Sequence, residues 1–211
     1  MDKIRIEHLY KSIAGINILN DISLAIEKGT CCGIIGNNGS GKTVLFKCIL
    51  GFYKTDSGDI YVDGVMRKKT DGIISGTSAV IEEPAFIENM SGIMNLRYLY
   101  ELNHKKDVNY LQSLMKSLGL DPCNKKPVKK YSLGMRQRLS IAQLLMDDND
   151  FLIIDEPMNG LDKRGVEEVR AIFLNLKDKG KTLFISSHNP KDIDILCDKT
   201  YEIDNGTIIS S

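Results

Sequence analysis

The sequence predicts an α/β fold whose core is a mainly parallel β-sheet. The last third of the chain is the main evidence, because apolar runs over 151–154 and 182–186 flank a helical pattern over 166–176. Continuous apolar runs are typical of parallel strands that are buried on both faces. The order strand, helix, strand then implies right-handed crossovers. The first third alternates apolar and polar residues instead, as antiparallel strands with one solvated face do.

The N-terminal part is expected to form an antiparallel β portion made of short strands. Ile4, Ile6 and His8 alternate with charged residues, and the same pattern returns over 22–26. An apolar run over 60–62 precedes Asp-Gly, a pair that favours a tight turn. Further turns are expected at 27–29 and 56–58.

The middle of the chain carries helical periodicity. The spans 90–102 and 108–118 repeat apolar residues every three or four positions, which predicts two amphipathic helices. Asp107 is suited to cap the start of the second helix, and Gly119 is suited to end it. We therefore expect a helical subdomain inserted at about 89–145 within a single domain of residues 1–211.

Composition and charge exclude several classes of protein. The chain has 211 residues, of which 42% are hydrophobic and 27% are charged, as in ordinary globular proteins. Its 28 basic residues equal its 28 acidic residues, whereas binding nucleic acid without sequence preference needs a positive excess, so no nucleic acid is expected. No apolar run reaches about 18 residues, and the N-terminus lacks the apolar core of a secretory signal. These features predict a cytoplasmic protein that meets a membrane only through a partner.

One glycine-rich segment has the pattern of a phosphate-binding loop. It reads Gly36-Asn37-Asn38-Gly39-Ser40-Gly41-Lys42-Thr43, which is a complete P-loop. An apolar strand over 32–35 precedes it, and a helix is expected from Val44 to Leu50. We therefore expect the loop N–H groups, the positive end of the helix dipole and Val44 to lie next to the phosphates. Lys42 is expected to reach the β- and γ-phosphates, and the Thr43 hydroxyl is expected to coordinate Mg²⁺.

Two acidic residues follow the buried strand over 151–154. Asp155 stands where a P-loop enzyme holds Mg²⁺ with a carboxylate, the Walker B position. Glu156 comes next, so its side chain should point elsewhere, towards an attacking water molecule that a carboxylate would orient and polarise.

Several further motifs, in this order, resemble those of ABC transporter ATP-binding subunits over nearly the whole chain. Tyr10 matches the aromatic residue that stacks on adenine in that family. Residues 131–138, Tyr-Ser-Leu-Gly-Met-Arg-Gln-Arg, resemble the family signature LSGGQ-x-QR. Asn-Gly-Leu-Asp at 159–162 resembles the D-loop, in which Asp162 stands, and His188 resembles the switch histidine at the γ-phosphate.

The resemblance implies a P-loop NTPase fold of the ABC type, with ATP and Mg²⁺ as its cofactors. Ser132 is suited to N-cap a helix that begins at Leu133. In the family this helix end faces ATP on a second subunit, where Ser132, Gly134 and the helix dipole would bind the γ-phosphate. The implied partners are a second nucleotide-binding domain, identical or not, and transmembrane permease subunits that hold the chain on the inner face of the membrane.

The chain departs from the family pattern at two places. The signature reads Tyr-Ser-Leu-Gly-Met, so Met135 replaces the usual glutamine and lacks its amide. Glu82 stands at the position of the Q-loop glutamine, where it is expected to couple the state of the nucleotide to the permease. This pattern resembles the ATPases of bacitracin resistance and lantibiotic immunity, which implies an exporter. The acidic residues 82, 83 and 88 either meet a basic loop of the permease or form a solvated loop.

Two rival interpretations stay open on the sequence alone. One is a soluble ABC-type ATPase that acts without a permease, for example in cofactor assembly. The other is a regulator that binds nucleotide without hydrolysing it, although Glu156 and His188 count against that role. The four lysines at 125, 126, 129 and 130 are interpreted as a solvated loop rather than as a phosphate contact.

Overall fold

The computed structural model describes residues 1–68, 72, 74–82 and 85–210. In this part of the chain the main strands form two sheets. The first is antiparallel, in the order β2-β1-β4-β5, and consists of β1 (Asp2–Ile13), β2 (Ile16–Glu27), β4 (Ser57–Val62) and β5 (Val65–Met66). The second runs β10-β9-β3-β8-β7-β6 and consists of β3 (Cys31–Ile35), β6 (Thr77–Val80), β7 (Phe151–Ile154), β8 (Thr182–Ser187), β9 (Lys199–Asp204) and β10 (Thr207–Ser210).

The second sheet is parallel except at one edge, where β10 pairs antiparallel with β9. This confirms the mainly parallel core and the antiparallel N-terminal portion. The helices are α1 (Lys42–Leu50), α2 (Gly92–Tyr100), α3 (Val108–Ser117), α4 (Leu133–Leu145), α5 (Lys163–Asp178) and α6 (Pro190–Leu196), with a 3₁₀ turn at Val128–Lys130. None of the helices in the described residues is both long and apolar enough to cross a membrane.

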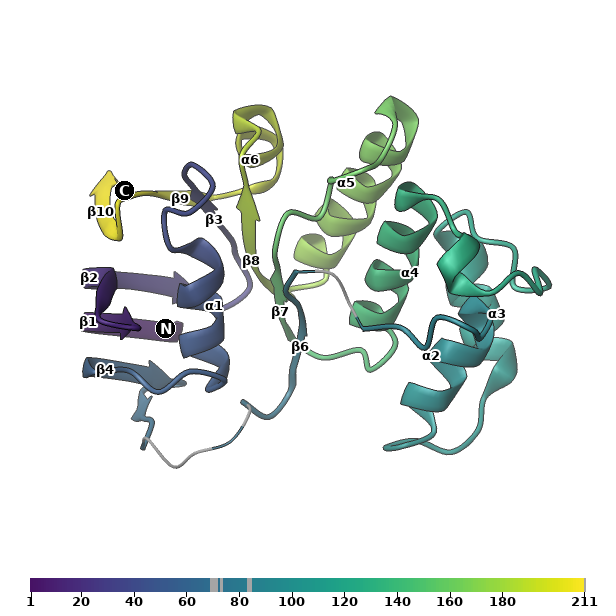
Figure 1. The fold of residues 1–211 in the computed structure, drawn as a ribbon, viewed down its shortest axis with the longest axis horizontal. Helices are drawn as coiled ribbons and strands as arrows, with labels where there is room; N and C mark the ends of the chain where they lie inside the picture. The colour runs from purple at the N-terminus through teal and green to yellow at the C-terminus, as the bar shows by residue number, and fades with distance from the viewer. Residues whose placement is uncertain (69–71, 73, 83–84, 211) are drawn as a thin grey trace.

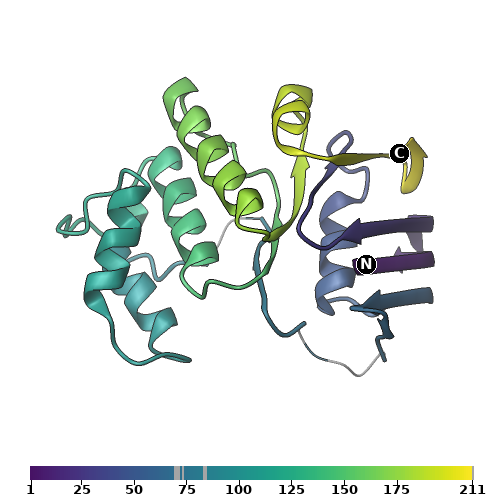
Figure 2. The ribbon, with the colours of Figure 1, turned by 180° about the vertical axis from the view of Figure 1, so that it is seen from behind.

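Figures 1 and 2 show the layers from opposite sides. Helix α1 lies between the antiparallel sheet and the parallel sheet, and α2, α3 and α4 gather at the far end of the molecule. The parallel strands are therefore covered on both faces. Ile153 and Phe184 face the cluster around α1, where Phe184 meets Phe46 edge to face at 4.9 Å between ring centroids. Leu152 and Ile154 face the cluster built by the helices on the other side, which is why the run over 151–154 has no polar residue.

The predicted alternation of Ile4, Ile6 and His8 holds for the two isoleucines, which are buried, and fails at His8. The register of β1 shifts between Ile6 and Leu9, and His8 adopts a φ of 49° in this irregularity. The extra residue reverses the alternation, so that Leu9 is buried in the core while the His8 side chain is 77% exposed. The expected turn at 56–58 is also displaced, because β4 already begins at Ser57.

Within the described residues, side-chain caps fix the starts of four helices, among them α3, α4 and α5. The Asp107 carboxylate accepts a hydrogen bond from the Tyr110 N–H, and Ser132 caps α4, as predicted. Asp162 accepts from the Gly165 N–H at 2.8 Å and starts α5 at Lys163, three residues before the predicted helix. The signature motif and the D-loop therefore both meet the start of a helix.

Candidate active site

Three neighbouring parallel strands deliver the predicted catalytic residues to one edge of the sheet. Strand β8 lies between β3 and β7, and all three run in the same direction. The carboxyl end of β3 leads into the P-loop, that of β7 leads into Asp155 and Glu156, and that of β8 leads into His188. The parallel pairing of these strands thus brings together residues that are more than 100 positions apart in the chain, such as Thr43 and Asp155.

The P-loop has the backbone shape that its glycines were expected to allow. Gly39 and Gly41 adopt φ values of 83° and 110°, which strain other residues, and the loop tip over 37–39 is exposed. A Cβ atom at Gly36 would lie 2.2 Å from the Ile203 carbonyl oxygen of β9. Lys42 is 6% exposed, and its Nζ donates to the Gly36 and Asn37 carbonyls at 2.6 and 3.1 Å. The lysine charge is therefore held inside the loop.

The two oxygen groups that were predicted to hold a metal ion lie in contact. The Thr43 hydroxyl donates to Oδ2 of Asp155 at 2.8 Å, and the Ser186 hydroxyl donates to Oδ1 of the same carboxylate at 2.5 Å. A carboxylate and a hydroxyl next to a phosphate-binding loop are the kind of oxygen ligands that Mg²⁺ takes together with substrate phosphates. The donor set fits Mg²⁺.

The Glu156 carboxylate has a different partner from Asp155 and pairs with His188. Its Oε2 lies 2.7 Å from Nδ1 of His188 and 3.3 Å from the His188 backbone N–H. The glutamate side chain is 18% exposed, whereas the His188 side chain is 59% exposed. The second carboxylate oxygen of Glu156, Oε1, is buried and has no hydrogen-bond partner among the described residues. A buried carboxylate oxygen without a donor is suited to accept a proton or a hydrogen bond from water.

The signature helix α4 starts beside the acidic residues of the same chain. Ser132 is exposed, and its Oγ accepts the Met135 N–H at 3.2 Å. Gly134 lies close to the D-loop, since a Cβ atom there would sit 3.1 Å from the Gly160 carbonyl oxygen. A cleft of about 510 Å³ opens here, within the range of ligand sites. It is lined by Glu82, Leu133, Gln137, Asp155, Glu156, Asn159 and Gly160.

Glu82 lines this cleft but is bound to α1. Its carboxylate lies 2.8 Å from Nζ of Lys47, one turn beyond the P-loop end of that helix, and Glu82 has a φ of 58°. The hydrogen bond that Lys47 donates to Glu82 raises the pKa of the Lys47 ammonium. Of the other acidic residues that were singled out there, Glu88 is exposed, and Glu83 lies outside the described residues.

Two predicted residues stay apart from this cluster. Tyr10 is 37% exposed on β1 and pairs with Ser57, and its contact with adenine stays a prediction. Asp162 caps α5 at the far end of the D-loop.

The four lysines between 125 and 130 are all exposed, as a solvated loop requires.

Sequence reasoning missed three side chains that hold the catalytic groups. Ser186 binds Asp155, Gln137 donates to the Pro157 carbonyl at 2.9 Å, and Lys47 binds Glu82. A signal existed only for Ser186, because it ends an apolar strand parallel to the one that precedes Asp155. The other two contacts join elements whose relative placement the sequence pattern does not contain.

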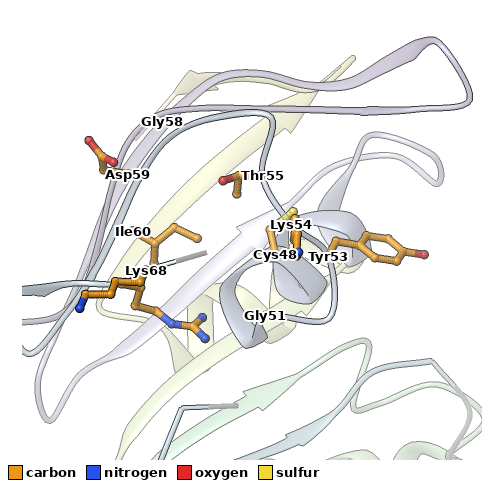
Figure 3. A pocket seen from close by; sticks show the side chains of 10 residues that line it. Cys48, Gly51, Tyr53, Lys54, Thr55, Gly58, Asp59, Ile60 and Lys68 are labelled. Carbon is orange, nitrogen blue, oxygen red and sulfur yellow. The ribbon is translucent and has the colours of Figure 1, made fainter. Parts of the chain in front are cut away.

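A second hollow lies beyond the carboxyl end of α1 (Figure 3). Lys54, Lys68 and Asp59 are among the residues around it. Its volume is about 70 Å³, much smaller than the cleft of about 510 Å³ beside the acidic residues. It contains none of the predicted site residues.

The sequence was compared with known families and proteins. Residues 19–159 match the family described as "ABC transporter". An uncharacterised ABC transporter ATP-binding protein of Bacillus subtilis is 35% identical, over 99% of this chain and 95% of the relative. A lantibiotic transport ATP-binding protein of Streptococcus pyogenes is 36% identical, over 98% and 89%. A bacitracin transport ATP-binding protein of Bacillus licheniformis is 34% identical, over 98% of this chain and 68% of the relative.

Solved structures agree with the fold. CbiO1 of Clostridium perfringens, described as part of an ABC transporter complex, superposes with a TM-score of 0.83 at 26% identity, covering 99% of this chain and 87% of the other. A dimeric bacterial ABC transporter cassette gives a TM-score of 0.88 at 19% identity, covering 98% and 97%. The second likeness shows the fold alone.

Proposed function

This chain belongs to the ABC transporter ATP-binding proteins, a family that hydrolyses ATP, and from that membership we propose that it powers an exporter of the peptide-antibiotic resistance or immunity type. The observation that supports this proposal best is the meeting of P-loop, acidic pair and histidine at one sheet edge. The lantibiotic and bacitracin transport relatives support the choice of cargo class. In this proposal the chain lies on the inner face of the membrane, bound to permease subunits.

The P-loop residues bind and orient the phosphates. The exposed N–H groups over 37–39 and the start of α1 offer donors and a positive dipole end. Lys42 places its ammonium beside these groups, so that charge develops on the phosphates next to a fixed cation. Ser40, Gly41 and Val44 complete the cradle, and Tyr10 would stack on the adenine ring.

Thr43 and Asp155 would hold Mg²⁺, which when bound neutralises charge on the β- and γ-phosphate oxygens. Ser186 binds Oδ1 of Asp155, so Oδ2, the oxygen that Thr43 contacts, has a defined direction.

Glu156 acts on the attacking water, and His188 steadies both the glutamate and the γ-phosphate. The hydrogen bond between Oε2 and Nδ1 of His188 fixes the carboxylate, so Oε1 remains the oxygen that accepts a proton from water. A general base of this kind contributes roughly 10²–10⁴-fold to a rate.

A second nucleotide-binding domain would close the site. Ser132 and Gly134 at the start of α4 would contact the γ-phosphate held by the other subunit, and Asp162 in the D-loop would lie at the same junction. Closing and opening of this dimer would then drive the permease.

Glu82 is the residue that we assign to coupling. Its pairing with Lys47 ties the segment before the helical subdomain to the helix that carries Lys42 and Thr43, so a change at the phosphates reaches Glu82 through one helix. We expect Glu82→Gln to change the ATPase rate or its coupling to transport. Unchanged ATPase and unchanged transport in that variant would contradict the assignment.

The proposed function is tested by a pull-down of the tagged chain from gently solubilised native membranes, with the partners identified by mass spectrometry. We expect a partner with several membrane spans at near-equal amount. Recovery of soluble partners only, with the chain absent from the membrane fraction, would favour an ATPase that acts without a permease.

A further inference from the structure

Glu156 has an unusual backbone conformation for a residue with a side chain. Its φ is 50°, in the left-handed region that glycine adopts at no cost. Strand β7 ends at Ile154, so Glu156 lies beyond the regular ladder of the sheet. Such a conformation persists only where the surrounding structure holds it, and it often marks an active site.

On the N-terminal side of Glu156, the Ser186 hydroxyl binds two groups at once. It accepts the Glu156 backbone N–H at 2.9 Å and gives its own proton to the Asp155 carboxylate at 2.5 Å. The Ser186 side chain is buried, with an exposure of 0%, so water does not compete for these bonds. Ser186 thus ties the peptide unit that enters Glu156 to the carboxylate of its neighbour.

On the C-terminal side of Glu156, the Gln137 amide binds the backbone. Its Nε2 donates to the Pro157 carbonyl at 2.9 Å and approaches the Glu156 carbonyl at 3.4 Å. Gln137 projects from α4, about one turn after the Ser132 cap. The segment that follows Glu156, held mainly at the Pro157 carbonyl, is thus tied to the helix that carries the signature motif.

We propose that Ser186 and Gln137 are positioning residues that clamp the backbone on both sides of Glu156 and thereby aim its carboxylate. Neither side chain touches the reacting atoms. Because Gln137 comes from α4, the direction of Glu156 depends on where the signature helix lies. The proposal rests on the proposed role of Glu156 in hydrolysis, but the clamp itself is measurable without nucleotide.

The first test measures hydrogen exchange of the Glu156 amide in the nucleotide-free protein by ¹⁵N NMR. We expect Ser186→Ala to raise the exchange rate of that amide at least tenfold, and Ser186→Thr, which keeps the hydroxyl, to restore protection. Ser187→Ala is the matched control, because Ser187 is equally buried on the same strand but bonds Asp192 and Asn189. Exchange of the Glu156 amide at the wild-type rate in folded Ser186→Ala would overturn the proposal.

The second test measures steady-state ATP hydrolysis. We expect Ser186→Ala and Gln137→Met each to lower kcat about tenfold or more while KM for ATP changes less than about twofold, because groups that hold a catalytic carboxylate typically contribute 10–100-fold. Gln143→Met, on the same helix but with a side-chain oxygen that has no hydrogen-bond partner within the described part of the chain, should keep the wild-type kcat. If Gln137→Met keeps the wild-type kcat, Gln137 is not part of the clamp. If Ser186→Ala does not fold, the kcat of Gln137→Met still tests the proposal.

The two proposals fail separately. Glu156→Gln with wild-type hydrolysis would overturn the role of Glu156, whereas the amide exchange rates would still support or contradict the clamp. Loss of kcat in Ser186→Ala with unchanged Glu156 exchange would show that Ser186 acts through Asp155 alone and would overturn the clamp.

Discussion

Ser132 has two roles that a single substitution separates. In the chain itself it caps α4, since its Oγ accepts the Met135 N–H at 3.2 Å. In the proposed dimer the same exposed hydroxyl meets the γ-phosphate of the other subunit. Ser132→Ala removes both functions, but Ser132→Asp keeps the cap, because aspartate caps helices as well as serine does.

The expected magnitudes differ for the two roles. Loss of the cap in Ser132→Ala should cost about 1 kcal/mol, or a Tm lower by about 2–4 °C in a chain of this size, whereas Ser132→Asp should melt at the wild-type temperature. A carboxylate about 6 Å from a phosphate charge, at an effective dielectric constant of about 20, is repelled by about 3 kcal/mol. Dimer formation with ATP should therefore weaken about 100-fold in Ser132→Asp.

The assay is size-exclusion chromatography with ATP, carried out in the hydrolysis-poor Glu156→Gln background so that the dimer accumulates. Ser113→Asp places the same charge on the exposed face of α3 and should dimerise normally. If Ser132→Asp dimerises with ATP as readily as this control, the hydroxyl is only a helix cap, and the assignment of the start of α4 to the γ-phosphate is wrong.

Three further predictions follow from the same geometry. Glu156→Gln should lower ATP hydrolysis by roughly 10²–10⁴-fold and accumulate an ATP-bound dimer in chromatography, and hydrolysis at the wild-type rate would contradict its role as the base. Lys42→Ala should lose ATP binding in equilibrium titration, and tight binding by that variant would refute the lysine contact. Burial raises the pKa of the Cys32 and Cys48 thiols to about 12 from 9.0, so their thiolate fraction at pH 8 is about a thousandfold lower than that of a free thiol, while Cys123 is exposed. Dithionitrobenzoate should therefore label Cys123 rapidly and the two buried thiols only after unfolding, and rapid labelling of either in the folded protein would contradict their burial.

Most of the fold was predictable because its signals are local. The apolar run over 151–154, the cap at Asp107 and the glycine pattern of the P-loop each lie within about ten residues of chain. The bulge at His8 was not predictable, because a single extra residue reverses the alternation without leaving a distinct composition. The early start of α5 was missed for a different reason: Asp162 was interpreted as a D-loop residue, although it also caps the helix.

The residues of the candidate site also fall into those that local sequence signals predict and those that such signals do not predict. Lys42, Thr43, Asp155 and Glu156 could be assigned because each stands next to a strand or helix end, and parallel strands bring such ends together. The bond of Gln137 to the segment after Glu156 depends on how closely α4 approaches β7, which is set by packing between elements. Sequence reasoning therefore identifies the reacting groups more easily than it identifies the groups that hold them in place.

The bonds already present in the site affect how ATP gains affinity. Lys42 donates to the Gly36 and Asn37 carbonyls, and Thr43 donates to Asp155. A phosphate or metal ion that takes these donors replaces existing bonds, so each exchange contributes only the difference between the two bonds. For the Lys42 ammonium this difference favours ATP, because a charged phosphate replaces neutral carbonyls. Residues 37–39 of the loop are exposed, so phosphate can reach their backbone N–H groups. A hydrogen bond between a backbone N–H and a charged phosphate is worth more than one to water, so the loop backbone adds binding free energy to that of the Lys42 ammonium, whose bond to phosphate is assisted by charge on both partners.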